Sequence, residues 1–152
     1  MIDSKWLGKV EFFKDLAEKE IKDISKLSEV VELKAGEVVF TEGDTAKGLY
    51  VLKSGKVSIE MSVSGEDRMS LYTVTKEGET FGWSALVEPF DMTASARCVE
   101  DSVLVVVSGE KLREYIQEDF HAGYLIMKRI ARMMSRRVKT TRIQLLHSHY
   151  GG

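Results

Sequence analysis

Cysteine and proline are nearly missing from this 152-residue sequence, which has one of each, Cys98 and Pro89. A lone cysteine cannot form an internal disulfide, so the disulfide-rich secreted folds are excluded and a reducing cytoplasm is favoured. Long apolar runs are missing as well, since residues 103–107 form the longest and are far too short to cross a bilayer. The first residues contain an acid and no apolar stretch follows, so we expect no signal peptide. These absences predict one cytoplasmic domain, residues 1–152, without a membrane segment.

Residues that carry metal or catalytic chemistry are also scarce. The three histidines, His121, His147 and His149, lie outside the β-rich part of the chain, whereas a metal-binding barrel needs histidines and carboxylates on its strands. His147 and His149 could chelate a metal, but a frayed tail explains them as well. Cys98 has no histidine in the same region to activate it, and no glycine-rich phosphate motif of nucleotide-binding enzymes is present. The sequence therefore predicts neither an enzyme nor a metal centre.

Acidic residues are absent from the last part of the chain. All 24 lie at or before Asp119, while residues 120–152 carry seven basic residues. These are Lys128, Arg129, Arg132, Arg136, Arg137, Lys139 and Arg142. They would occupy several faces of a helix, where they could contact phosphates weakly or, more simply, solvate the helix and pair with the acidic body.

The predicted secondary structure changes along the chain from helical to β-rich and back to helical. Residues 10–28 are predicted to be helical, with Asp15 as the N-cap and Glu18 in the capping-box position. Short β-rich runs broken by glycine turns follow, at residues 30–33, 37–40, 49–52, 56–61 and 69–74, with two more strands within 94–107. Many short strands at regular spacing favour a sandwich or barrel, here a β-roll over about residues 30–107. Residues 110–117 are predicted to form a short helix.

The longest periodic segment is a helix expected over about residues 119–146. Its apolar positions step by four and three in a heptad seam, which predicts a homodimer through this helix. The seam consists of Phe120, Tyr124, Met127, Ala131, Met134, Val138, Thr141 and Leu145. A second apolar line, formed by Ile126, Ile130 and Met133, would pack on the β-roll. The alternative is a helix lying on one large core without a partner.

Glycines and strand residues recur in a fixed order over residues 33–57. The order is Leu33-x-x-Gly36-Glu37-Val38-Val39-Phe40-x-x-Gly43-Asp44, then Leu49-Tyr50-Val51-Leu52-x-x-Gly55-x-Val57. This pattern resembles the cyclic-nucleotide-binding domains of Crp/Fnr-type regulators, cyclic-nucleotide-dependent kinases and gated channels. The resemblance covers about residues 12–141. It implies a mainly β fold, an eight-stranded jelly-roll (double-stranded β-helix) barrel with N-terminal helices and a long C-terminal helix. It also implies a stand-alone domain, because a chain ending at Gly152 leaves no room for the DNA-binding domain of the family's transcription factors.

Residues 78–96 resemble the family's phosphate-binding cassette. In such a cassette a short helix, here expected at residues 84–88, begins after a glycine and turns its free N–H groups toward an anion. The candidate ligand-binding residues are Phe81, Gly82, Trp83, Ser84, Ala85, Met92, Thr93 and Ala94. Near the end of the long helix, the resemblance places Thr141, with Thr140 beside it, where cyclic-AMP receptors contact the purine. Thr141 is equally explained as a polar residue of the heptad seam.

Two positions depart from the family pattern. Trp83 stands where the family has a glutamate for the ribose hydroxyl, and Met92 stands where it has an arginine for the cyclic phosphate. Arg97 would lie on the opposite strand face and replace that arginine only through a bulge.

The departures leave two functional hypotheses. One is a small-molecule sensor that binds a cyclic nucleotide in an altered way, or another small planar ligand, with no certain cofactor. The other is a ligand-free dimeric interaction or scaffold module whose pocket is filled by Trp83 and Met92.

Overall fold

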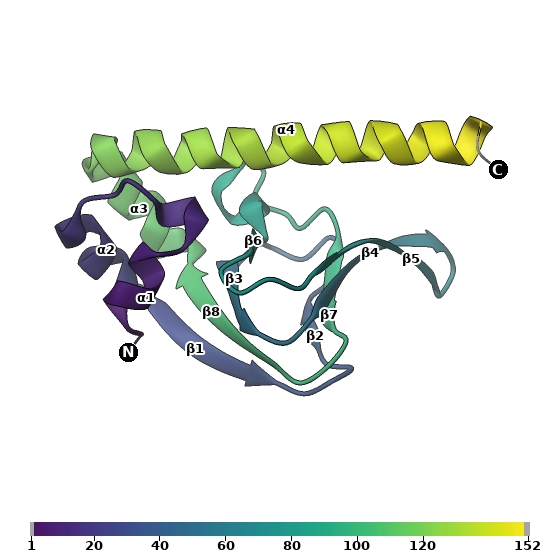
Figure 1. Ribbon diagram of the computed structural model, residues 1–152, viewed down its shortest axis with the longest axis horizontal. Coiled ribbons are helices and arrows are strands. Elements are labelled where there is room, and N and C mark those ends of the chain that lie inside the picture. The colour runs from purple at the N-terminus through teal and green to yellow at the C-terminus, as the bar shows by residue number, and fades with distance from the viewer. Residues whose placement is uncertain (1, 151–152) are drawn as a thin grey trace.

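The computed structural model describes residues 2–150, which form two facing sheets with helices at one end and a long helix across the top (Figure 1). The helical elements are α1 (Ser4–Gly8), η1 (Glu11–Phe13), α2 (Glu18–Ser25), η2 (Trp83–Leu86), α3 (Gly109–Glu118) and α4 (Phe120–Tyr150). The strands are β1 (Ser28–Leu33), β2 (Val38–Phe40), β3 (Gly48–Ser54), β4 (Val57–Ser64), β5 (Asp67–Val74), β6 (Thr80–Phe81), β7 (Ser95–Cys98) and β8 (Ser102–Ser108). None of the helices in this range is both long and apolar enough to cross a membrane.

The eight strands form two antiparallel sheets of four. Their orders are β1-β8-β3-β6 and β2-β7-β4-β5. The jelly-roll expectation is confirmed, but the expectation of a closed barrel is wrong, because no ladder joins the two sheets within residues 2–150. The seven strands expected from the sequence are all present. The two-residue β6 was not expected as a separate strand, since so short a segment shows no alternation.

The core has two parts. One lies between the sheets, where side chains such as Leu52, Val57, Phe81 and Leu104 are fully buried. The other lies under the helices, where buried residues of α1, α2, α3 and α4 form one cluster with residues of β3 and β8. Burying these apolar side chains is the main driving force for the fold. Together the two parts fix the position of η2, which contributes buried residues to both.

The N-terminal helical region differs from the sequence prediction. Residues 10–28 were expected to be helical, with Asp15 as the N-cap of a short helix, but Asp15 has a positive φ of 75° and lies before α2. The N-cap is Ala17, whose N–H donates to the Glu20 carboxylate at 2.8 Å. The long C-terminal helix was also underestimated, because it continues through the tail residues expected to be frayed as far as Tyr150.

The two apolar lines of α4 face opposite environments. Of the second line, Ile126 and Ile130 are buried and Met133 is partly buried, all against one core cluster. All eight residues of the predicted dimer seam are exposed. The seam is thus an uncovered apolar stripe along α4, on a helix that runs the length of the molecule (Figure 1).

Candidate functional site

The cassette, residues 78–96, is built on the β6–η2 corner. Gly82 joins the two elements with a φ of 82°, a conformation that glycine adopts without strain. A Cβ on Gly82 would lie 2.8 Å from Cδ2 of Tyr50, whose ring stacks on Phe81 at 5.5 Å between centroids. Glycine is therefore required at this corner for two reasons. The short helix that follows is the 3₁₀ turn Trp83–Leu86, not the expected 84–88.

Met92 fills the inner end of the cassette. Its side chain is 3% exposed and packs in the core between the sheets. Its backbone is fixed at both ends, because its N–H donates to Asp44 and its carbonyl accepts from Gly43, both at 2.8 Å. The remaining inner chamber, bordered by Phe40, Ile59 and the cassette, measures about 30 Å³, which is room for a water or two.

Trp83 is only partly buried and borders the inner chamber on its open side. The next residues, Ser84, Ala85 and Leu86, are buried. The Ala85 carbonyl accepts a 2.5 Å hydrogen bond from Nη1 of Arg113 on α3, and the Arg113 guanidinium lies 4.3 Å from the Phe90 ring centroid. The cassette is thus tied directly to the helical layer.

Arg97 is not near the cassette chamber. Its Nη2 donates to Oε2 of Glu60 at 2.8 Å on the outer face of the β4–β7 pair. This hydrogen bond, which outweighs the effect of burial, holds the pKa of Glu60 below its usual range. A bulge does occur between β2 and β7, yet Arg97 stays engaged with Glu60.

A much larger outer hollow, about 680 Å³, adjoins the inner chamber between the cassette, the β4–β5 hairpin and α4. It brings together Trp83, Thr93 and Ala94 with Thr140 and Thr141, which are more than 45 residues away in sequence. Of the predicted site residues, Phe81, Gly82, Ser84, Ala85 and Met92 do not line it.

Sequence reasoning missed several residues of the outer hollow, among them Tyr72, Arg137 and Gln144. The Arg137 guanidinium lies 3.6 Å from the Tyr72 ring centroid, and Nε2 of Gln144 donates to the Leu71 carbonyl at 3.0 Å. Burial raises the pKa of Tyr72, with Arg137 opposing that effect. No sequence signal marks these contacts, because they depend on how α4 lies on the hairpin.

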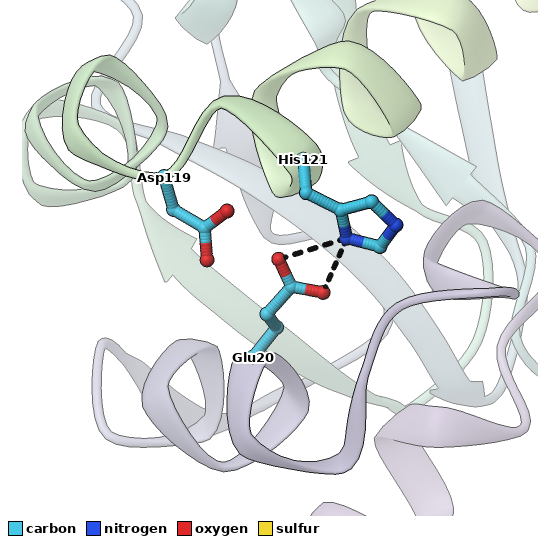
Figure 2. Close-up of side chains that lie close together, drawn as sticks. All are labelled: Glu20, Asp119 and His121. Atoms are coloured by element: carbon cyan, nitrogen blue, oxygen red, sulfur yellow. Dashed lines mark hydrogen bonds and ion pairs between the residues drawn. The ribbon is translucent and has the colours of Figure 1, made fainter.

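His121, Glu20 and Asp119 meet where α4 begins (Figure 2). Nδ1 of His121 lies 2.9 and 3.1 Å from the two Glu20 oxygens. Asp119 accepts from the Ala122 N–H, and this hydrogen bond is the largest contribution to its lowered pKa. The carboxylates therefore already have protein donors, and the cluster connects the first turn of α4 to α2.

The family model for the cyclic nucleotide-binding domain matches residues 30–119. The chain belongs to the cyclic nucleotide-binding domain family. This domain is 26% identical over 135 residues to a CRP-like cAMP-activated global transcriptional regulator of Mycobacterium tuberculosis, covering 89% of this chain and 58% of the regulator. It is 28% identical over 102 residues to human cGMP-dependent protein kinase 2, covering 67% of this chain and 13% of the kinase.

Among solved structures, a Geobacter metallireducens protein assigned as cyclic nucleotide-binding superposes with a TM-score of 0.82 at 30% identity. That match covers 91% of this chain and 99% of the other. This cyclic nucleotide-binding domain thus spans little more than half of the mycobacterial regulator and nearly all of the Geobacter protein.

Proposed function

We propose that this chain is a small-molecule-sensing regulatory domain whose ligand binds in the outer hollow. The observation that carries the proposal is the contrast between the two spaces: the inner chamber is about 30 Å³, whereas the outer hollow is about 680 Å³. A ligand of nucleotide size fits only the second. The proposal includes no catalytic step and places the domain in the cytoplasm, in keeping with its single buried Cys98.

The walls of the outer hollow suit a planar, anionic ligand. Trp83 and Tyr72 offer aromatic surfaces, and the hydroxyls of Thr93 and Thr140 offer hydrogen bonds. Arg137 supplies a guanidinium that can pair with a carboxylate or phosphate. By family resemblance, Trp83 and Met92 replace the ribose glutamate and the phosphate arginine, so cyclic AMP or cyclic GMP would not bind in the usual way.

The proposal extends to a homodimer formed through the seam of α4. An apolar stripe left exposed over the whole helix is unusual for a monomer, and its four-three spacing is that of a coiled coil. Because Arg137, Thr140 and Thr141 line the hollow from the same helix, a ligand there would contact the dimer element directly. Ligand binding would thereby be coupled to the geometry of the pair.

Calorimetry and thermal-shift measurements with cyclic AMP, cyclic GMP and other planar anions test the sensing proposal. We expect saturable binding of at least one of them, weakened in a Thr93→Val/Thr140→Val double variant. Thr73→Val/Thr75→Val is the matched control, because both threonines are exposed outside the hollow. Binding by neither wild type nor control, or equal loss in the two double variants, would contradict the proposal.

The second candidate function is the ligand-free dimeric interaction module. One observation favours it, the buried Met92 side chain that closes the inner chamber. Trp83 does not complete the closure, because it borders the chamber and the open hollow alike. We therefore favour the sensor.

A further inference from the structure

A second hollow, which we call the arginine hollow, lies on the other side of Trp83 between η1, the start of β6 and α4. Its volume is about 170 Å³, enough for several waters or a small anion. Four arginines of α4 line it: Arg129, Arg132, Arg136 and Arg137. Phe12, Tyr72, Trp83 and Met133 form its apolar wall.

Nearby acids balance only part of the positive charge of this hollow. Only Arg129 is paired: its Nη2 lies 3.1 Å from Oδ2 of Asp15. Within residues 2–150 no ion pair involves Arg132, Arg136 or Arg137.

Two acids, Glu11 and Glu79, also line the hollow. One oxygen of Glu79 accepts from the N–H groups of Thr75 and Lys76, each at 3.2 Å, which fixes this carboxylate in place but leaves its negative charge. Four guanidinium groups therefore face three carboxylates, Asp15, Glu11 and Glu79, so the hollow keeps one net positive charge.

Spacing along α4 makes this charge costly. Arg129, Arg132 and Arg136 are separated by three and four residues, so they share one helix face and repel one another. In addition, Nε of Arg129 is buried and has no hydrogen-bond acceptor within the described part of the chain. A bound anion would relieve the repulsion among these guanidinium groups.

We propose that the arginine hollow is a second binding site, for a small phosphate-bearing anion of the monoester or diphosphate class. Guanidinium groups match tetrahedral phosphate oxygens through paired N–H donors, and several arginines favour a multiply charged group over a single carboxylate. The site is distinct from the outer hollow, although Trp83, Tyr72 and Arg137 border both. An anion there would contact α4 and the cassette at once.

Intrinsic fluorescence tests the site with inorganic pyrophosphate as the probe. The chain has two tryptophans, and Trp6→Phe leaves Trp83, on the wall of the hollow, as the only emitter. We expect a saturable change in Trp83 emission on adding pyrophosphate, and a weaker one with inorganic phosphate. In an Arg132→Ala/Arg136→Ala variant the affinity should fall at least about tenfold, because each charge-assisted hydrogen bond contributes roughly that factor.

The matched control removes the same charge elsewhere on α4. Lys139→Ala/Arg142→Ala alters two exposed basic residues outside the hollow, and its affinity should stay within about twofold of wild type. An Arg132→Lys/Arg136→Lys variant keeps the positive charge but loses the paired N–H donors of the guanidinium groups, so it should bind pyrophosphate with intermediate affinity.

Three results would overturn the inference: no saturable response to pyrophosphate, equal losses in the two alanine variants, or tight binding of a DNA duplex that pyrophosphate does not displace. Because Arg132 and Arg136 do not line the outer hollow, the planar-ligand experiment can succeed or fail independently of this one.

Discussion

Met92→Ala tests the claim that a thioether closes the inner chamber. The change removes the outer part of a side chain that is 3% exposed and packed between the sheets. Truncating a buried methionine to alanine costs about 2–5 kcal/mol, since apolar burial is lost and a cavity remains. Met92 already borders a small void, so the expected cost is about 3 kcal/mol. For a domain of this length that corresponds to a fall in Tm of roughly 6–12 °C.

Urea denaturation followed by circular dichroism measures this loss directly. Met69→Ala is the matched control, because that methionine is 56% exposed on β5 and should lose no more than about 0.5 kcal/mol. A loss below about 1 kcal/mol at Met92, or an equal loss at Met69, would refute the packing argument. The explanation for the closed inner chamber would then have to be abandoned.

Three further predictions concern the dimer, an ion pair and a turn. Val138→Glu puts a charge on the exposed seam, so sedimentation velocity should show a dimer for wild type and a monomer for the variant. Glu60→Gln removes the ion-pair partner of Arg97. The pKa of Glu60 is lowered in the folded protein, so the ionised carboxylate stabilises the fold fully above the unfolded pKa of about 4.3. This stabilisation disappears as the pH falls through the folded pKa. The variant should therefore be less stable than wild type at pH 7, with the difference vanishing in acid. Gly55→Ala would place a Cβ 2.6 Å from Cα of Ser102 at a φ of 103°, so urea denaturation should show a loss of about 3 kcal/mol or more.

Each of these three changes has a control elsewhere in the chain. Lys139→Glu is an exposed change off the seam and should leave the dimer intact. Glu66→Gln alters an exposed acid without an ion pair in the described part of the chain, and its stability should follow wild type at every pH. Gly36→Ala also has a positive φ but meets no atom within 4 Å, so its loss should be only about 1 kcal/mol. If a control behaves like its partner variant, the corresponding structural argument is wrong.

The fold was predictable from the sequence mainly because glycines mark its corners. Gly36 and Gly55 both have positive φ, and the strands between the marked turns fall where alternation places them. The cap at Asp15 was wrong because the Glu20 carboxylate takes the Ala17 N–H, a competition that spacing alone does not decide.

The candidate site was predictable only in part. The cassette residues follow from family resemblance, and the exposed seam follows from its periodicity. The contact of Arg137 with Tyr72 and the clustering of arginines around Trp83 depend on the rotation of α4 about its axis. That rotation is fixed by the packing of Ile126 and Ile130 on the body, which periodicity indicates without giving the neighbours.

The way α4 is fastened has a mechanical consequence. Its buried residues all lie in the first half, and beyond Met133 the interactions described with the hairpin are Arg137 over Tyr72 and Gln144 to the Leu71 carbonyl. Two such contacts contribute roughly 1–2 kcal/mol in total. The distal half of α4 is therefore held weakly, whereas the first half is anchored by its buried residues. At 1.5 Å per residue the segment from Met133 to Tyr150 is about 26 Å long, and a bend of about 5° at Met133 would move the tip of α4 by about 2 Å. Modest binding energy is therefore enough to reposition the tip.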